Sequence, residues 1–300
     1  MITGHPEPMD CNSMKPTTAL RRLIERPEIL LCPGTYDPLM AKLVKQVGFE
    51  AIYMTGAGVS HNALAMPDLG LTTMTEMVDR AARLADASEL PLICDADTGF
   101  GNAINVMRTV KEYERAGVAG LHIEDQDIPK RCGHLFGKSL VPTSEMVGKI
   151  KAALDTRKDD DFIIIARTDA RTAVGFEEAM ERAHAYSQAG AVVIFFESPR
   201  SREELEAVPQ SIDKPVLANM VETGLTPFLP AAELEAIGYN MVIYAGGLSR
   251  FLTRQAEGFL LNLKDTGSTE AYWDQMNSFA EQNELLELSK YEALSQKYAG

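Results

Sequence analysis

Eight short apolar runs, separated by segments with helical periodicity, recur along this chain. The runs have the length of β-strands and fall at residues 29–32, 51–54, 92–94, 120–123, 162–166, 192–196, 216–218 and 241–244. Strands that are apolar on both faces are typical of a parallel sheet covered by helices. Because eight strand–helix units close a barrel, the pattern predicts an α/β protein with a TIM-type (β/α)8 barrel over residues 16–264.

Helices are expected between the strands at residues 38–47, 76–87, 104–116, 145–156, 177–189 and 231–237, after a short helix at 17–26. Several end at a glycine just beyond the last turn, which is a common helix stop: Gly48, Gly117, Gly190 and Gly238. A doubly wound open sheet is the alternative, but no GxGxxG motif follows the first apolar run. A length of 300 residues suits one barrel domain.

The two ends of the chain fall outside the repeating pattern. Residues 1–15 are expected to form a mobile N-terminal arm, residues 249–264 the eighth barrel helix, and residues 265–300 a helical extension for oligomerisation. In the extension, Tyr272, Met276 and Phe279 stand at i, i+4 and i+7, which predicts an apolar helical stripe. The stripe packs either on the chain's own barrel or on a neighbouring subunit.

Charge and cysteine usage narrow the class of partner. A formal net charge of −14 argues against nucleic acid and anionic membranes, but a local basic pocket still allows small acids as substrates. The cysteines Cys11, Cys32, Cys94 and Cys132 show no CxxC spacing, so neither zinc nor a disulfide framework is expected. The first residues lack the apolar core of a signal peptide. A cytoplasmic protein is expected, with an organellar matrix as the alternative.

Polar residues cluster where the expected strands end. They are Tyr53, Thr55, Asp95, Asp97, His122, Glu124, Arg167, Glu197 and Asn219. The carboxyl ends of barrel strands form one face, where barrel enzymes place their sites. Asp95 and Asp97 are expected to share one strand face, as are His122 and Glu124. Three carboxylates in this place favour Mg2+, with Mn2+ as the alternative. A core histidine bonded to a neighbour is the simpler interpretation of His122.

A dense group of reactive side chains follows in the segment Lys130-Arg131-Cys132-Gly133-His134-Leu135-Phe136-Gly137-Lys138. Its cations are expected to lower the pKa of the Cys132 thiol, and its glycines to let the segment move. We interpret it as a mobile loop that brings an acid, Cys132, onto an anionic substrate. A solvated basic loop with an incidental cysteine is the alternative.

These groups together suit one kind of reaction. A metal polarises adjacent hydroxyl or keto and carboxylate oxygens, while Arg167 and the backbone amides of residues 55–58 bind a carboxylate. Removing the hydroxyl proton of a 2-hydroxy dicarboxylate then breaks a carbon–carbon bond in a retro-aldol step. The carbanion that leaves needs a proton, and Cys132 is the natural donor.

The motifs resemble those of the isocitrate lyase and phosphoenolpyruvate mutase superfamily, in family order over roughly residues 30–255, and the Cys-Gly-His loop resembles its methylisocitrate lyase-like branch. Further matches are the Ala-Arg-Thr-Asp-Ala run at 166–170, Glu197-Ser198 and residues 219–227. The resemblance implies a homotetramer, a dimer of dimers, in which terminal helices are exchanged between subunits. It also implies a metal site with Asp95 and Asp97, in which Asp68 and Glu124 hold metal-bound water.

The resemblance assigns the remaining site residues as well. Cys132 is the acid and base, and the catalytic set also includes Arg167, Tyr53, His134 and Lys130. Substrate-binding roles fall to Thr55, Gly56, Ala57, Gly133, Arg167, Glu197, Asn219, Arg250, Leu135 and Phe136. Thr55 and Ala57 replace the family's usual serine and glycine, which should leave the carboxylate-binding turn usable.

The residues after Cys-Gly-His separate the possible substrates. Relatives that cleave methylisocitrate, a tricarboxylate, carry an arginine there, whereas this chain has Leu135 and Phe136. An unpaired third carboxylate would be costly in a closed pocket. The expected reaction is therefore cleavage of an alkylmalate such as 2,3-dimethylmalate to pyruvate and propionate. Methylisocitrate cleavage, hydrolysis of oxaloacetate to oxalate and acetate, and a catalytically silent assembly protein are the alternatives. Phosphonomutase relatives lack the cysteine loop.

Overall fold

The computed structural model describes residues 14–299 and contains a closed parallel barrel with its strands in sequence order. The strands are β1 (Leu30–Thr35), β2 (Ile52–Met54), β3 (Leu92–Asp95), β4 (Gly120–Glu124), β5 (Ile163–Thr168), β6 (Val193–Phe196), β7 (Val216–Asn219) and β8 (Met241–Tyr244). Strand β8 pairs with β1 and closes the ring. The predicted (β/α)8 fold is confirmed, and the strand boundaries differ from the expected ones by at most three residues. The predicted mobile arm lies almost wholly outside the described residues.

The barrel interior explains why polar residues end the strands. Buried apolar side chains at alternate strand positions, among them Ile93, Ile165 and Phe195, form one cluster inside the barrel. Successive strand residues point to opposite faces, so the residue two positions later also points inward. Two positions after Ile93, Ile165, Phe195 and Leu217 come Asp95, Arg167, Glu197 and Asn219. The inward rows of β3, β5, β6 and β7 therefore each end in a polar side chain at the same mouth of the barrel.

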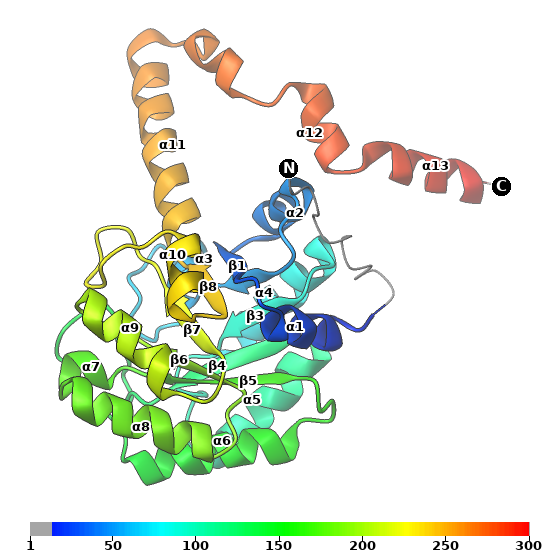
Figure 1. Cartoon of the computed structure of the whole chain (residues 1–300). Helices are drawn as coiled ribbons and strands as arrows, with labels where there is room; N and C mark the ends of the chain where they lie inside the picture. Colours follow the sequence, from blue (N-terminus) through cyan, green and yellow to red (C-terminus); the bar gives the residue numbers. More distant parts are fainter. Residues whose placement is uncertain (1–13, 300) are drawn as a thin grey trace, which may run out of the picture.

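Helices wrap the outside of the barrel (Figure 1). They are α2 (Pro38–Val47), α4 (Met74–Ser88), α5 (Ala103–Arg115), α6 (Thr143–Thr156), α8 (Phe176–Gln188), α9 (Arg202–Ser211) and α10 (Ala231–Ile237), with the short α3 (Gly56–Leu64) and α7 (Ala170–Ala173) at the strand ends. Local signals bound α2, since Asp37 accepts a hydrogen bond from the Met40 amide and Gly48 ends it with φ +99°. The pattern missed α3, α7 and α9. Two glycines begin α3, α7 is a single turn, and α9 contains Pro209.

A helix before the barrel closes its amino end. Leu20, Leu23 and Ile24 of α1 (Pro16–Glu25) are buried in the same cluster as the inward-facing strand residues. A Cβ atom on Gly120, the first residue of β4, would lie 3.3 Å from the Leu20 side chain. Burying each of these side chains contributes about 1.5–3 kcal/mol. Side chains of α1 thus fill this end of the interior, and the polar residues lie at the opposite end of the strands.

The chain beyond β8 leaves the barrel. Helix α11 (Gly247–Thr266) has no buried residue and projects outward, and the 3-10 helix η2 (Glu270–Gln275), α12 (Phe279–Leu285) and α13 (Leu288–Tyr298) continue the arm (Figure 1). The expected helix at 249–264 exists, but its expected place as the eighth covering helix is wrong. The arm touches its own barrel again at α2, where Leu285 is buried and Glu287 pairs with Lys42.

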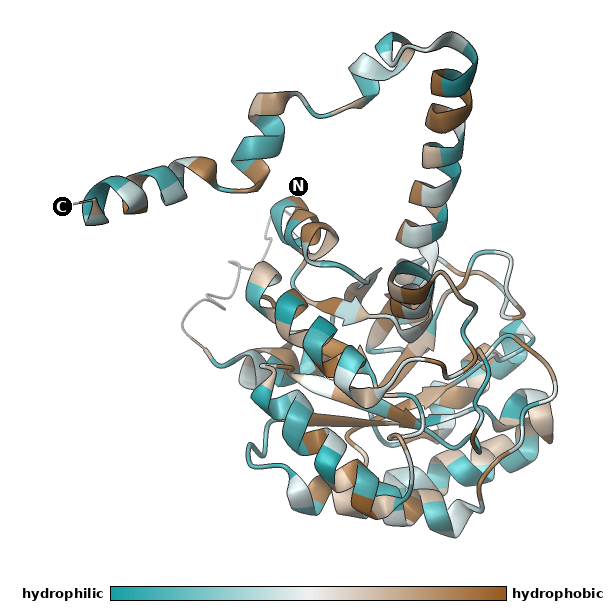
Figure 2. Ribbon diagram, turned by 180° about the vertical axis from the view of Figure 1, so that it is seen from behind, coloured by the Kyte–Doolittle hydropathy of each residue, from teal (hydrophilic) through white to brown (hydrophobic). Residues whose placement is uncertain are grey.

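The predicted apolar stripe of the arm is also wrong as a helical stripe. Tyr272 lies in η2, Met276 is extended with φ −104° and ψ 146°, and Phe279 begins α12. The helix breaks there because Ser278 caps α12 in a reciprocal pair of hydrogen bonds with Glu281. The arm nevertheless leaves large apolar side chains in solvent on a ribbon of mixed hydropathy (Figure 2), including Trp273, Phe279, Tyr291 and Tyr298.

Truncation after Lys264 tests the role of this arm in assembly. Exposed apolar area of this extent is typical of a protein–protein contact, so we expect the truncated protein to form smaller assemblies or to aggregate. Size-exclusion chromatography with light scattering measures the mass. An unchanged assembly mass would show that residues 265–300 do not contribute to subunit contacts.

No helix within residues 14–299 combines the length and the apolar character needed to cross a bilayer.

Candidate active site

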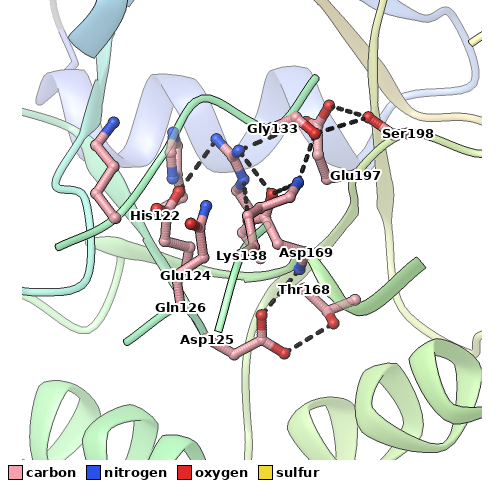
Figure 3. A network of polar contacts seen from close by, with 12 residues as sticks. His122, Glu124, Asp125, Gln126, Gly133, Lys138, Thr168, Asp169, Glu197 and Ser198 are labelled. Atoms are coloured by element: carbon pink, nitrogen blue, oxygen red, sulfur yellow. Dashed lines mark hydrogen bonds and ion pairs between the residues drawn. The ribbon is translucent and has the colours of Figure 1, made fainter. Parts of the chain in front are cut away.

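The barrel mouth gathers charged side chains that are almost completely buried. Asp95, Asp97, His122, Glu124, Lys130, Arg167, Asp169 and Glu197 are each 7% exposed or less. Figure 3 shows Glu124, Lys138, Asp169 and Glu197 directed toward one another from different strands and from the loop after β4. Burial of so many ionisable groups is costly unless each has a partner or a ligand. The buried charged side chains therefore gather at the face of the barrel where the sequence predicted the site.

Asp95 and Asp97 come together in a different way from the one predicted. Strand β3 ends at Asp95, and Asp97 has φ +46°, so the two residues do not share a strand face. The Asp97 amide instead donates a hydrogen bond of 2.9 Å to Oδ1 of Asp95, forming a tight turn. A left-handed conformation is costly for a residue other than glycine and is typical of functional sites.

Lys130 links this turn to a third carboxylate. Its Nζ atom lies 2.5 Å from Oδ1 of Asp68 and 2.7 Å from Oδ1 of Asp97. Burial, followed by the charges of Asp95 and Asp68, raises the pKa of Asp97 to about 6 despite the ammonium of Lys130. Burial would also raise the pKa of Asp95, but His122, Lys130 and Arg167 outweigh it and lower that pKa to about 2.

The inward pair on β4 behaves as strand alternation predicts. The Nε2 atom of His122 shares a hydrogen bond of 2.8 Å with the Tyr53 hydroxyl. Burial lowers the pKa of His122 to about 4, so the ring is neutral at pH 7. Neither carboxylate oxygen of Glu124 has a hydrogen-bond partner among residues 14–299, although Oε2 lies 3.3 Å from Nη1 of Arg167. Burial raises the pKa of Glu124 well above its usual value. Within residues 14–299, the ion pair with Arg167 is thus the one contact that offsets the burial of this carboxylate, which has no hydrogen bond.

The donor set fits a hard divalent cation. Around the mouth stand the acids Asp68, Asp95, Asp97, Glu124, Asp169 and Glu197, and the three cations Lys130, Lys138 and Arg167. No three Asp, Glu, His or Cys side chains of the described chain converge into a complete ligand cage. Mg2+ commonly keeps several waters and takes only one or two carboxylates. Buried acids outnumber the buried cations, and Glu124 accepts no hydrogen bond within residues 14–299, so the site fits such an ion.

Arg167 stands at the centre of the carboxylate-binding part of the site. Its Nε and Nη2 atoms donate to the two oxygens of Asp169 at 2.9 and 3.1 Å. The guanidinium also lies 4.0 Å from Glu197 and 4.9 Å from the centre of the Phe195 ring. Asn219 donates to Glu197 at 3.1 Å. These contacts fix the plane of the guanidinium, which leaves its remaining N–H group on Nη1 directed toward Glu124 and the mouth.

The Cys-Gly-His segment is held over Arg167 and Glu197. A Cβ atom on Gly133 would lie 2.6 Å from Nη2 of Arg167 and 2.7 Å from the Glu197 side chain, so only glycine fits there. His134 accepts a hydrogen bond of 3.0 Å from the Leu225 amide, and its Nε2 lies 3.2 Å from Glu197. The Cys132 amide donates to the Asp68 carbonyl at 3.3 Å. The backbone at Cys132 and Gly133 thus runs from Asp68 to Arg167 and Glu197.

The predicted lowering of the Cys132 pKa is wrong. Burial raises the pKa of the thiol above its ordinary value of 9.0, and Asp68 and Glu197 add to the increase. The cations expected to lower it are occupied elsewhere, since Lys130 pairs with Asp68 and Asp97 while Arg131 is exposed. A thiol with a raised pKa stays protonated at neutral pH, which is the state that a proton donor needs.

This pKa direction predicts how Cys132 reacts with pH. Because the folded protein disfavours the thiolate, alkylation by iodoacetamide should reach half its maximal rate only above pH 9. Mass spectrometry of the Cys132 peptide measures the rate, with N-acetylcysteine as the control. Below pH 9 the thiol should keep its proton and remain able to act as an acid. Half-maximal alkylation below pH 8 would contradict the burial effect.

The predicted amide cradle at residues 55–58 is mostly occupied by the protein itself. The Thr55 amide donates to the Thr35 carbonyl, and the Gly56 amide donates to Oδ2 of Asp95. The Gly58 amide donates to the Thr55 hydroxyl. The reason is that α3 begins here and Thr55 caps it. Ala57 remains at the first turn, where the helix dipole favours an anion.

Three predicted substrate contacts lie at the periphery. Leu135 and Phe136 are 45% and 61% exposed, and the Phe136 ring packs over the Arg200 guanidinium at 5.5 Å. Arg250 is half-exposed and donates to the Glu222 carbonyl at 2.6 Å and to the Thr223 hydroxyl at 3.1 Å. The structure therefore places these side chains at the rim and not among the buried acids.

Four residues of the network had no predicted role: Asp125, Lys138, Asp169 and Ser198. Asp125 is buried and accepts hydrogen bonds of 2.8 Å from the Thr168 hydroxyl, the Asp169 amide and the Tyr186 hydroxyl. It directly follows the inward Glu124, so strand alternation assigns it to the outer face and to packing. Lys138 ends the segment that contains Cys132, and Asp169 lies in the Ala-Arg-Thr-Asp-Ala run. Their place in these motifs was the only sequence feature that pointed to a role in the site.

Comparison with known proteins identifies the family of this chain. Residues 20–260 match the family described as phosphoenolpyruvate phosphomutase. The 2,3-dimethylmalate lyase of Eubacterium barkeri is 49% identical over 286 residues, which cover 95% of this chain and 99% of that protein. The probable 2-methylisocitrate lyase 2 of Corynebacterium glutamicum is 46% identical over 279 residues, or 93% of this chain and 91% of that protein.

Solved structures of related enzymes have the same fold over nearly the whole chain. Oxaloacetate acetylhydrolase in complex with the inhibitor 3,3-difluorooxalacetate has a TM-score of 0.91 at 36% identity, covering 95% of this chain and 98% of that one. Phosphonopyruvate hydrolase in complex with oxalate and Mg2+ has a TM-score of 0.86 at 30% identity, covering 96% and 100%.

Fold, site and relatives define this protein as a (β/α)8-barrel enzyme of the carbon–carbon lyase class, among the oxo-acid lyases. Its site is built from buried carboxylates beneath a cysteine loop. The chain belongs to the phosphoenolpyruvate mutase and isocitrate lyase superfamily, whose lyases are metal-dependent. The resemblance drawn from the motifs is confirmed, and the alternative of a silent assembly protein is not supported.

Proposed function

We propose that this enzyme cleaves 2,3-dimethylmalate to pyruvate and propionate by a retro-aldol reaction. The observation that carries the proposal is the position of Gly133, next to Cys132, which lies so close to Arg167 and Glu197 that no side chain would fit there. Burial raises the pKa of the Cys132 thiol, which suits a proton donor. The dimethylmalate lyase at 49% identity supports the same substrate. Mg2+ or Mn2+ would be held by Asp95 and Asp97, with Asp68 and Glu124 binding its waters.

The residues divide the work between the two halves of the substrate. A metal ion held by these acids would supply Lewis-acid polarisation of the substrate's hydroxyl and carboxylate oxygens. Arg167 and Asn219 orient the carboxylate of the pyruvate half, and Tyr53 remains a neutral donor because burial and the Asp95 charge raise its pKa well above the usual value. One of the buried carboxylates at the mouth would accept the hydroxyl proton. The bond between C2 and C3 then breaks, C2 becomes the carbonyl carbon of pyruvate, and the electron pair of the bond moves to C3. Cys132 then protonates C3, which yields propionate.

The charges around the site favour a substrate with two carboxylates. Every buried cation around the mouth, within residues 14–299, already has an acidic partner: Lys130 with Asp68, Lys138 with Asp169, and Arg167 with Asp169 and Glu124. A bound metal and Arg167 would neutralise the carboxylates of a dicarboxylate, but a third carboxylate would find no further buried cation among these residues, and leaving it unpaired would be costly. The exposed Leu135 supplies none at the rim.

A substrate screen tests the proposal. Purified enzyme with Mg2+ is supplied with 2,3-dimethylmalate, methylisocitrate, isocitrate or oxaloacetate, while pyruvate, glyoxylate and oxalate are measured by coupled assays. We expect the highest kcat/KM for 2,3-dimethylmalate, with pyruvate and propionate in equal amounts. Faster turnover of methylisocitrate, or release of oxalate from oxaloacetate as the main reaction, would replace the proposed substrate.

Replacing Leu135 by arginine should move the preference toward tricarboxylates. The position is half-exposed, so the longer side chain fits without overpacking. One new charge-assisted hydrogen bond is worth about 1.5–3 kcal/mol, so the ratio of kcat/KM for methylisocitrate over 2,3-dimethylmalate should rise about tenfold or more. Leu135→Met is the control without charge. An unchanged ratio would show that this position does not select the substrate.

We also propose that the protein assembles as a homotetramer, a dimer of dimers, through the arm from α11 to α13. The exposed apolar side chains of that arm support this proposal, and the truncation after Lys264 tests it.

A further inference from the structure

A buried ion pair joins the cysteine loop to the site arginine. Lys138 lies at the end of the loop segment, its side chain is 1% exposed, and its Nζ is 2.8 Å from Oδ1 of Asp169. The same ammonium donates to the Gly133 carbonyl, next to Cys132. Figure 3 shows Lys138 between Gly133 and Asp169. One side chain thus connects the loop backbone at Gly133 to the end of β5.

Asp169 serves two cations at once. Its Oδ2 accepts from Nε of Arg167, and its Oδ1 accepts from both Nη2 of Arg167 and Lys138. Burial would raise the pKa of Asp169, but Arg167 and Lys138 outweigh it and hold that pKa well below its usual value. The carboxylate therefore stays ionised and orients the arginine and the lysine together.

The support of Asp169 comes from behind the barrel wall. Asp125 accepts from the Asp169 amide and from Thr168, and it is itself held by the Tyr186 hydroxyl of α8. Asp169 is therefore fixed to the rigid part of the fold, whereas Lys138 belongs to the loop. Opening of the loop would carry Lys138 away from Asp169, so this contact would stabilise the arrangement in which Gly133 lies against Arg167 and Glu197.

We propose that Lys138 and Asp169 are positioning residues, which hold the cysteine loop closed over the substrate and set the plane of Arg167 in the same step. Neither residue needs to touch the reacting atoms. This inference rests on the proposed function in one respect, namely that Cys132 acts as the acid while the loop is closed. A buried ammonium is stable only with its partner, so removing either charge favours the open loop.

The test measures exposure of the Cys132 thiol and does not depend on the substrate. Full-length enzyme with Mg2+ and oxalate is treated with iodoacetamide, and alkylation of the Cys132 peptide is followed by mass spectrometry. Lys138→Met and Asp169→Asn should each raise the alkylation rate about tenfold or more and lower kcat by a similar factor. The double variant should be no more reactive than the more reactive single variant, because the two residues act as one unit.

The matched control is Arg131→Met, which removes an exposed cation of the same loop that donates a long hydrogen bond of 3.4 Å to the Phe136 carbonyl, within the loop, rather than pairing with the barrel wall. It should leave both rates within about twofold, as surface substitutions generally do. If Lys138→Met does not fold, Lys138→Gln keeps a donor for the Gly133 carbonyl and removes the charge. A folded Lys138 variant with native thiol protection would overturn the proposal, even if its kcat were reduced. The alkylation assay stays readable when the substrate screen selects another acid, so the two proposals fail separately.

Discussion

Cys132→Ser should lower kcat for 2,3-dimethylmalate by at least about a hundredfold while KM changes little. General acid catalysis by a placed side chain is worth roughly a hundredfold to ten-thousandfold, and a serine hydroxyl is nearly isosteric with the thiol but a much weaker acid. Arg167 and Asn219 remain in place and still bind the pyruvate half, so ground-state binding should survive. Steady-state kinetics with coupled detection of pyruvate measures both constants.

Ser139→Ala is a suitable control for this variant because Ser139 is exposed close to the same loop. It should retain native kcat. Near-native kcat in Cys132→Ser would remove the acid role from the cysteine, whichever substrate the enzyme uses. A large increase in KM with unchanged kcat would assign Cys132 to binding alone.

Asp97→Ala should reduce kcat/KM by at least about a thousandfold and leave the fold intact. Lewis-acid stabilisation by a bound metal is worth several kcal/mol, and Asp97 is one of the carboxylates that would hold the ion. Lys130 keeps its contact with Asp68, so the loop loses only one of its two anchors at this point. Kinetics and thermal unfolding are measured on the same preparation.

The matched control is Asp79→Ala, which removes a carboxylate from an exposed ion pair with Arg83 on α4. Exposed pairs contribute about 1 kcal/mol or less, so this variant should be active and stable. Excess chelator should inactivate the native enzyme, and added Mg2+ or Mn2+ should restore it. Full activity in excess chelator would refute the assignment of Asp95, Asp97, Asp68 and Glu124 to a metal site.

The sequence alone determined the barrel and the location of its site. Alternation along a strand and the count of strands are local properties, so the inward rows could be followed from Ile93 to Asp95 and from Ile165 to Arg167 without coordinates. Helix ends marked by Asp37 and Gly48 are equally local. The family motifs then indicated which of these polar ends form an active site.

Only the tertiary structure decided the electrostatics of that site. Sequence neighbours predicted an electropositive Cys132, but the pKa of a thiol depends on how much water the fold removes and on where each cation finds its partner. The same holds for Asp97, which reaches Asp95 through a left-handed turn, and for Lys138, whose partner Asp169 lies 31 residues away. Whether α11 covers the barrel or leaves it is likewise set by long-range packing, because its residues have the same helical periodicity in either place.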